Sequence, residues 1–460
     1  MLNTSLVHDV LEAALSAGGD FAEVFAENTE ATGLTMINGT VEKALWGVDY
    51  GCGIRVFSGY GATYAHTNDI SRDNLIKIAK GASQAARENS TMVSRNFNKL
   101  SFRSIHPILI APSSGEKKIA VDKLRMASEA SFAYNSRISQ TMGSLSGVTQ
   151  DVLIANSEGL WAEDHRVRTR VFIEAVASSS TEKQIGRMGP GAHKGFEFLN
   201  VLDFSSIGSE CARIAVTMLD AELCPSGRMP VIICNGFGGV IFHEACGHNL
   251  EATHVAVKSS VFSDCLGKQI ASDKVTAIDD GTIPGSWGSV NIDDEGSKTK
   301  RNVLIENGIL KSFLVDRLNG LRMGTESTGS ARRESYKYAP TSRMTSTFIA
   351  EGNDREEDII ADTEHGLYAR KMGGGSVQPT TGEFNFAVTE AYIIRNGKIA
   401  EPVRGATLIG KGSEVLLDID RVANNLALEQ GVCGSISGRV PTDCGQPTIR
   451  VKELTVGGRR

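Results

Sequence analysis

The spacing of apolar residues changes several times along the chain, and each change marks a predicted element. Apolar side chains recur at helical spacing over residues 5–17, which predicts a helix capped by Ser5 and ended by the glycines at 18–19. Over residues 21–66, short alternating runs are separated by Asn-Gly and Ser-Gly pairs, the pattern of an antiparallel meander. The chain is therefore expected to begin with a helix followed by antiparallel strands.

The middle of the chain returns to helical spacing and then again to alternation. Helices are predicted at residues 71–88, 116–134 and 204–220, and strands at residues 137–157 and 160–178. The glycine-rich segment 186–195 is interpreted as a linker. These elements predict an N-terminal α+β domain that covers residues 1–200.

The second part of the chain, residues 201–460, has mostly strand and turn signals. The run MPVIICN (229–235) predicts a buried strand, and Asn-Gly pairs at 307–308 and 396–397 predict two hairpins. The three glycines at 373–375 are interpreted as a loop that lies close to another part of the molecule or to a ligand. The predicted fold class is α+β, with a C-terminal domain of mostly antiparallel strands.

Composition limits the classes of function. The 460 residues are 41% hydrophobic and 22% charged, with a net charge of −6, which weighs against a nucleic-acid-binding protein. The N-terminus lacks the pattern of a signal peptide, and no segment has the roughly 18–20 apolar residues of a membrane span. The eight cysteines form no CxxC pair, so reduced thiols are expected. We therefore predict a cytoplasmic protein without nucleic-acid or membrane partners.

The segment His-Glu-Ala-Cys-Gly-His at residues 243–248 has the residue types of a zinc peptidase site. His243 and His248 are candidate ligands, and Glu244 is the candidate general base for a zinc-bound water. The histidines are five residues apart, one more than in the HExxH motif. Five helical residues turn by about 500°, so the two imidazoles would point about 140° apart on a regular helix. We therefore predict a π-type widening or a break of the helix at residues 245–248.

A catalytic zinc site needs a third protein ligand and an open position. The residue types and spacing leave five candidates for that ligand: Cys246, Glu251, His254, Cys433 and Cys444. A chance occurrence of two histidines and a glutamate is the alternative, but the preceding run VIICNGFGGVIF is strongly apolar. Unpaired polar groups in such surroundings are costly unless they bind a metal or each other.

Other polar and aromatic groups are assigned no role in catalysis. The acidic residues at 293–295 are interpreted as an exposed turn, in preference to a carboxylate metal site. The arginines at 332–333 are expected to face solvent, in preference to binding a peptide carboxylate. The three tryptophans, Trp46, Trp161 and Trp287, are expected to pack against neighbouring side chains.

The segment GFGGVIFHEACGHNLE (236–251) resembles the HExxxH region of the TldD/PmbA family. Residues 21–59, 290–296, 373–399 and 445–458 resemble further family segments in the same order, and the intact metal motif resembles the TldD side of the family. The resemblance implies a peptidase that draws unfolded or extended peptides into a chamber formed by two subunits. The second subunit would be a copy of the chain or a PmbA/TldE-like partner.

The resemblance also implies the third metal ligand. A Gly-x-Cys-Gly segment supplies a cysteine ligand in TldD proteins, and the matching segment here gives that role to Cys433. The expected site is one zinc held by His243, His248 and Cys433, with Glu244 as catalytic base; iron would also suit mixed nitrogen and sulfur donors. The competing interpretations are a non-catalytic partner subunit and a regulator that binds another protein. Residues that bind the substrate are not predicted.

Overall fold

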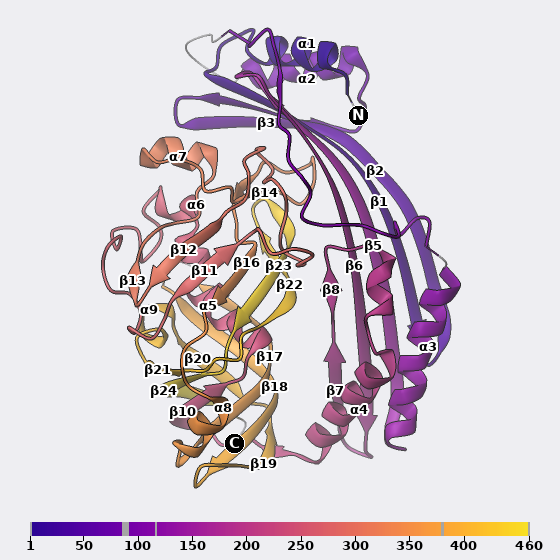
Figure 1. The fold of residues 1–460 in the computed structure, drawn as a ribbon, viewed down its shortest axis with the longest axis vertical. Helices are drawn as coiled ribbons and strands as arrows, with labels where there is room; N and C mark the ends of the chain where they lie inside the picture. Colours follow the sequence, from indigo (N-terminus) through magenta and orange to yellow (C-terminus); the bar gives the residue numbers. More distant parts are fainter. Residues whose placement is uncertain (1, 85–91, 116, 379–380, 459–460) are drawn as a thin grey trace.

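One long, curved and mostly antiparallel sheet forms the N-terminal half of this computed structural model, which describes residues 2–84, 92–115, 117–378 and 381–458 (Figure 1). Its strand order is β3-β2-β1-β5-β6-β4, and β7 and β8 also pair with β6. The strands are β1 (Phe21–Ile37), β2 (Thr40–Ser58), β3 (Gly61–Thr67), β4 (Asn98–Lys99), β5 (Ile138–Asn156), β6 (Leu160–Ser178), β7 (Lys183–Met188) and β8 (Gly191–Ala192).

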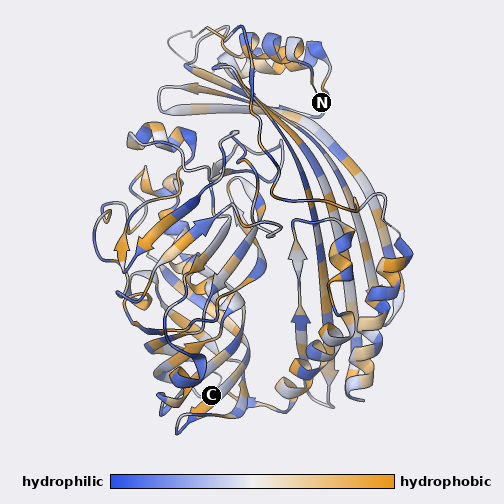
Figure 2. Cartoon of the chain, viewed as in Figure 1, coloured by the Kyte–Doolittle hydropathy of each residue, from blue (hydrophilic) through white to orange (hydrophobic). Residues whose placement is uncertain are grey.

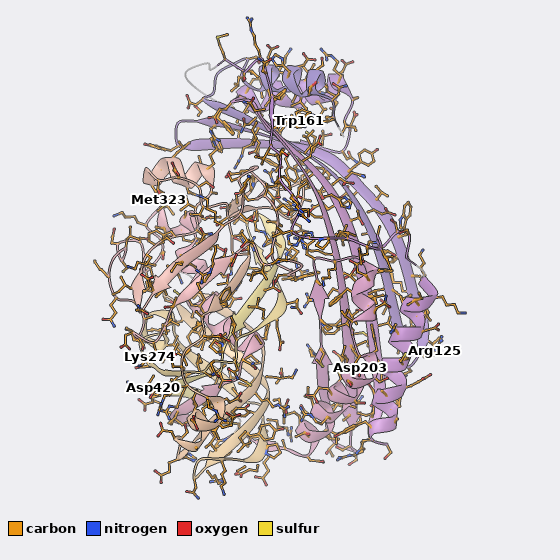
Figure 3. All side chains as sticks on the ribbon, viewed as in Figure 1. Arg125, Trp161, Asp203, Lys274, Met323 and Asp420 are labelled. Atoms are coloured by element: carbon orange, nitrogen blue, oxygen red, sulfur yellow. The ribbon has the colours of Figure 1, made fainter. Side chains whose placement is uncertain are left out.

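Helices cover the two ends of this sheet. Helices α1 (Thr4–Ala14) and α2 (Arg72–Gln84) pack at one end, in an apolar cluster that includes Trp161 (Figure 3). At the other end lie α3 (Lys117–Tyr134), the 3-10 helix η1 (Phe196–Asn200) and α4 (Phe204–Asp220). Asp203 caps α4 by accepting a hydrogen bond from the Ser206 amide. Apolar and polar residues alternate along the long strands, as half-buried sheets require (Figure 2).

Several predicted elements of this half are found, and some need correction. The helices predicted at 116–134 and 204–220 and both strands between them are confirmed, except that residue 116 lies outside the described residues. Asn3, not Ser5, caps the first helix, because its side chain accepts the Leu6 amide at 2.9 Å. The meander consists of three strands, two of which are far longer than the short runs suggested. The segment 186–195 is not a linker, because it contains the end of β7 and all of β8, and both strands pair with β6.

The C-terminal half contains two larger sheets. The first has the order β17-β10-β24-β20-β18-β19-β9, and because β17 also pairs with β18, it closes on itself. Its strands are β9 (Glu222–Leu223), β10 (Gly227–Ile233), β17 (His365–Gln378), β18 (Glu383–Arg395), β19 (Lys398–Arg404), β20 (Thr407–Lys411), β21 (Ile419–Val422) and β24 (Ile449–Gly457). The buried strand predicted from MPVIICN is β10, which is confirmed.

The second sheet carries one of the candidate ligands. Its order is β13-β12-β11-β16-β23-β22, so β22 is an edge strand. Its strands are β11 (Ala277–Asp280), β12 (Arg301–Glu306), β13 (Ile309–Leu310), β16 (Ser346–Ile349), β22 (Ala427–Ser435) and β23 (Gly438–Gln446), and a separate pair is formed by β14 (Ala331–Arg332) and β15 (Thr341–Ser342). The helices are η2 (Gly236–Gly239), α5 (Val240–Ala245), η3 (Gly247–Leu250), α6 (Ala252–Val255), α7 (Arg317–Met323), α8 (Glu356–Ala361) and α9 (Gly412–Val415).

The fold class is α+β as predicted, and the turn signals in the C-terminal half are reliable. Asn307 and Asn396 adopt φ values of 47° and 50°, and each lies at the tip of a predicted hairpin. The glycines at 373–375 are not a loop; they belong to β17, whose register with β18 shifts there. Residue 200, the predicted domain boundary, is the last residue of η1; the division into domains at that point stays a prediction. Among the described helices, none is long and apolar enough to cross a membrane.

The acidic residues at 293–295 and the arginines at 332–333 are buried, which contradicts both predictions of exposure. Asp294, Glu295 and Arg333 join the two halves of the chain through ion pairs. The Asp294 carboxylate accepts hydrogen bonds from Arg166 Nη1 and the Arg333 amide, both at 2.7 Å. Burial by itself would raise the pKa of Asp294. The nearby Arg166 and Arg333 outweigh this effect, so the pKa is lowered and the charged form is favoured. Trp161 and Trp287 are buried as predicted, whereas Trp46 is 61% exposed.

Glu23 lies at the centre of this ionic contact and links the long sheet to the C-terminal half. Its carboxylate oxygens lie 2.8 Å from Arg55 Nη2 and 2.7 Å from Arg333 Nη2. Replacement of Glu23 by alanine would leave two buried guanidinium groups without this partner. We expect the free energy of unfolding to fall by about 3–5 kcal/mol, measured by denaturant titration.

An exposed ion pair provides the control for this prediction. Arg395 and Glu401 pair on the surface, with side chains 58% and 44% exposed. The Glu401→Ala substitution should leave the unfolding free energy nearly unchanged, because water already solvates both charges. Equal effects of the two substitutions would show that the buried contact does not stabilise the junction between the two halves.

Candidate metal centre

The segment before the histidines is rich in glycine because it passes directly against another strand. It runs from the end of β10 through η2 into α5. A Cβ atom added at Gly239 would lie 2.3 Å from the carbonyl oxygen of Gly445 in β23. Any larger residue would therefore push α5 away from the sheet that carries Cys433.

The helix that carries His243 breaks before His248, as the spacing predicts. Helix α5 ends at Ala245, and Cys246 leaves the helical region with φ −127° and ψ −49°. The 3-10 helix η3 then begins at Gly247, where an added Cβ would lie 2.3 Å from Met344 Sδ. This break turns the His248 imidazole toward the His243 imidazole; their ring centroids are 5.1 Å apart and nearly perpendicular.

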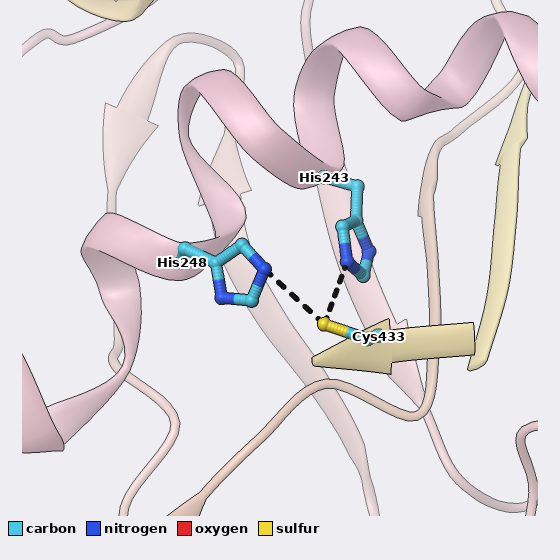
Figure 4. A group of neighbouring side chains, drawn as sticks. All are labelled: His243, His248 and Cys433. Atoms are coloured by element: carbon cyan, nitrogen blue, oxygen red, sulfur yellow. Dashed lines mark hydrogen bonds between the residues drawn. The ribbon is translucent and has the colours of Figure 1, made fainter. Parts of the chain in front are cut away.

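His243, His248 and Cys433 converge, although Cys433 lies 190 and 185 residues after the two histidines in sequence (Figure 4). Cys433 Sγ lies 3.2 Å from Nε2 of each histidine. All three residues are buried, and their donor atoms lie within 4.8 Å of one another. Cys433 reaches the histidines from β22, opposite α5 and η3, so three different elements define the position of the cluster.

The protonation of the three groups follows from their mutual contact. Burial alone would lower the pKa of His248, but Glu251 and Cys433 overcome this and raise it to about 10. Burial also opposes the charged form of His243, yet the sulfurs of Cys444 and Cys433 raise its pKa well above the usual value. Burial would raise the pKa of Cys433, but both histidines lower it well below its usual value. The pocket thus favours a thiolate at Cys433 and concentrates positive charge opposite it.

A second layer of charged residues holds the cluster. The Glu251 carboxylate lies 3.2 Å from His248 Nδ1, the ring nitrogen that faces away from Cys433. Arg343 lies 3.8 Å from the same carboxylate and donates a hydrogen bond of 2.7 Å to the Cys433 carbonyl. Both residues are fully buried. Glu251 was foreseen as a candidate ligand and not as a partner of His248, and no sequence signal pointed to Arg343.

Glu244 lies at the edge of the cluster. Its Oε2 is 3.8 Å from His248 Nε2, and its side chain is 25% exposed, in contrast to the buried histidines. A carboxylate in this position can contact both the donor cluster and a molecule that enters from solvent. That is the placement which a general base requires.

The remaining candidate ligands are not part of the three-donor group. Among the described residues, Cys246, His254 and Cys444 do not belong to the group whose donor atoms lie within 4.8 Å of one another around Cys433. Burial raises the pKa of the Cys246 thiol, which keeps it protonated. Cys444 lies close enough to His243 to affect its pKa, but it is not part of the three-donor group.

The donor set fits a single zinc-type cation. Zinc bonds of about 2.3 Å to sulfur and 2.0–2.1 Å to nitrogen, at tetrahedral angles, separate these donors by about 3.5 Å. The observed separation of 3.2 Å needs only a small expansion. A thiolate and two imidazoles are soft and borderline donors, which suit zinc or iron better than magnesium or calcium. Three protein donors also leave a fourth position for water or substrate.

Comparison with known sequences identifies relatives along the whole chain. Family models for the PmbA/TldA metallopeptidases match residues 22–86 (domain 1), 109–219 (central domain) and 226–458 (C-terminal domain). A metalloprotease TldD homolog of Buchnera aphidicola is 34% identical and aligns over 100% of this chain and 98% of its own length. A second such homolog, from Haemophilus influenzae, is 34% identical over 99% of this chain and 97% of its own length.

Solved structures show the same fold. A Thermotoga maritima protein, described as a candidate modulator of DNA gyrase, superposes with a TM-score of 0.81 at 20% identity, over 98% of this chain and 99% of that one. TldE from Thermococcus kodakarensis superposes with a TM-score of 0.78 at 19% identity, over 98% of this chain and 100% of that one. At this level of identity the likeness describes the fold alone.

Proposed function

Because the chain belongs to the PmbA/TldA metallopeptidase family, we propose that it is a zinc peptidase that cleaves unfolded or extended peptides. The observation that carries this proposal is the buried cluster of His243, His248 and Cys433, with the half-buried Glu244 beside it. A purely structural partner subunit would have no need of two imidazoles and a thiolate in one pocket. Such groups are costly to bury unless they bind a metal or each other, and a cation held by all three donors would offset that cost.

Each residue of the cluster has a proposed role. His243, His248 and Cys433 would hold the metal, and Glu251 would orient His248 through Nδ1, a contact that typically strengthens metal binding. Bound zinc would polarise the substrate carbonyl and acidify water. Glu244 would accept the proton of the attacking water and pass it to the leaving amine nitrogen. Iron in place of zinc would use the same ligands.

The position of Cys433 supports a preference for extended substrates. Cys433 lies on β22, an edge strand of its sheet, so an extended peptide could lie along this edge. Its main-chain hydrogen bonds would use groups of the strand other than the Gln430, Gly431 and Cys433 carbonyls, which already accept from Arg170, Trp287 and Arg343. Main-chain pairing accepts many sequences but needs an unfolded segment. Exposed apolar side chains beside the ligand, Val432 at 44% and Ile436 at 79%, offer contacts for such a segment or for a partner chain.

We also propose that two chains enclose the site, either two copies or this chain with a TldE-like partner. One exposed face of β2 supports an assembly, because it carries three large apolar or aromatic side chains at alternate positions. These are Trp46, Val48 and Tyr50, which are 61%, 47% and 49% exposed. Contiguous apolar surface of this kind commonly marks an interface with another protein.

The substrate preference is tested with one protein in two states. A disulfide-containing protein should resist cleavage while folded and should be cut after reduction and alkylation. The rates should differ by at least about 100-fold, because only the small fraction of folded molecules that are locally unfolded can be cut. Gel and mass analysis of both digests measures this ratio. Equal cleavage of the two forms would contradict recognition of extended chains, and no cleavage of either, with or without a TldE-like partner, would contradict the peptidase proposal.

A further inference from the structure

A cleft of about 680 Å³ separates the long N-terminal sheet from the C-terminal half. Strands β6 and β7 and the turn after them line one side, and β17 and β18 line the other (Figure 1). The inner end is formed by Phe237 and Gly238 of η2 and by Glu429 and Gln430 of β22. The cleft is therefore bounded by the two elements that lead directly to His243 and Cys433.

The charge of this cleft is opposite to that of the whole chain. The chain has a net charge of −6, yet Glu429 is the one acidic side chain among the described residues that line the cleft. The basic side chains in the lining are Arg170, Lys183, Arg187, Arg370, Lys371 and Arg404. Such a distribution attracts negatively charged ligands and raises their rate of association.

Three of these basic groups already have carboxylate partners behind the cleft. Arg187 pairs with Glu174 at 3.3 Å, and Arg370 pairs with Glu390 at 3.3 Å. Arg404 pairs with Glu182. These three charges are therefore largely neutralised, and they contribute little to attraction of a ligand.

The other three basic groups, Arg170, Lys183 and Lys371, have no carboxylate within ion-pair distance in the described part of the chain. The Arg170 guanidinium is half-buried, lies over the Trp287 ring and donates to the Gln430 carbonyl at 2.8 Å. Burial lowers the pKa of Arg170, with partial compensation by Asp443. A negatively charged ligand beside Arg170 would offset the remaining cost of burying its positive charge.

The cleft also lies at the right distance for the substrate. Gln430 at its inner end and the ligand Cys433 are three residues apart on one extended strand. At roughly 3.3 Å per residue, this separation is about 10 Å. If a peptide runs along β22 with its cleaved bond at the metal, its residues that lie three or more positions from that bond would therefore be inside the cleft.

We infer that this cleft selects acidic peptides: aspartate or glutamate side chains three or more residues from the cleaved bond would bind Arg170, Lys183 and Lys371. The inference rests on the proposed peptidase function and names its substrate class. A single-stranded nucleic acid is the other extended polyanion of comparable width. It is disfavoured because the basic residues of the cleft alternate with aliphatic and glycine residues, without a row of aromatic side chains on which bases could stack.

Binding is measured on the full-length, zinc-loaded Glu244→Gln variant, so that cleavage does not remove the probe. Three fluorescent peptides of one sequence carry glutamate, glutamine or lysine at the same positions, three to five residues from a common central bond. By fluorescence anisotropy at low ionic strength, the glutamate peptide should bind about tenfold tighter than the glutamine peptide. Added salt should reduce this difference, because it screens the charges.

Charge reversal in the cleft provides the matched comparison. Lys183→Glu with Lys371→Glu should abolish or invert the preference for the glutamate peptide. Lys398→Glu with Lys452→Glu changes the net charge equally at exposed positions outside the cleft lining, and it should preserve the preference. Equal effects of both double variants would assign the preference to net charge and would overturn the inference.

The outcomes separate this inference from the proposed function. If wild-type protein cleaves the glutamine peptide as efficiently as the glutamate peptide and binds both equally, the inference fails while the peptidase function stands. Tighter binding of a single-stranded DNA of equal charge than of the glutamate peptide would likewise overturn it. Preferential binding of the glutamate peptide without cleavage by the wild type would support the cleft assignment and contradict the peptidase function.

Discussion

Replacement of Glu244 by glutamine is expected to lower kcat for an unfolded peptide by about 1,000-fold, within the roughly 10²–10⁴-fold range of general acid–base catalysis. The amide keeps the size of the side chain but cannot accept a proton. Glu244 is only half-buried and lies 3.8 Å from His248, outside the three-donor cluster. The variant should therefore retain about one zinc per chain and its fold, while KM changes little.

A surface carboxylate is the control for this substitution. Glu453 is 54% exposed and pairs with Arg228 on the molecular surface, so Glu453→Gln should keep full turnover. Elemental analysis of the same samples separates catalysis from metal binding. If Glu244→Gln turns over the peptide as fast as the wild type, the general base is another residue. If the variant loses its zinc, Glu244 is part of the metal site.

Replacement of Cys433 by serine should have the second large effect, which is loss of the metal. Cys433 Sγ lies 3.2 Å from both imidazoles, which lower the pKa of its thiol well below the usual value, so it is the donor of the three that favours a negative charge. A serine hydroxyl is a far weaker ligand and stays protonated. We expect zinc affinity to fall by at least about 1,000-fold, measured by competition with a chromophoric chelator.

Cys444→Ser is the matched control, because Cys444 is also buried and lies near His243. The structure does not include it in the three-donor group. Its replacement should leave about one zinc bound per chain. If Cys444→Ser loses the metal and Cys433→Ser retains it, the third ligand has been misassigned.

Local features of the fold were predictable because near neighbours determine them. The helix at 204–220 follows from its apolar spacing, and the hairpins at Asn307 and Asn396 follow from turns that need positive φ. A π-type widening or a break between His243 and His248 follows from helix geometry once both imidazoles are required to bind one ion, and the structure has the break. Each of these features is set by residues within one or two turns of the chain.

Features that depend on distant partners were not predictable in this way. Asp294 was expected in solvent, but its partner Arg166 lies 128 residues away. The glycines at 186–195 resemble a linker in isolation, yet β7 and β8 complete the long sheet. Spacing left five candidates for the third ligand, and the convergence of Cys433 on the histidines comes from the pairing of β22 at the edge of its sheet.

The most direct test of the account is a cycle of metal removal and return on the wild-type chain, with a TldE-like partner present if the chain requires one. Cleavage of an unfolded peptide and bound zinc are measured on each sample. The account predicts that a chelator removes about one zinc per chain and abolishes cleavage, and that one equivalent of zinc restores both. Cleavage that persists in metal-free protein, or that stays absent in protein with a full zinc site, would contradict it.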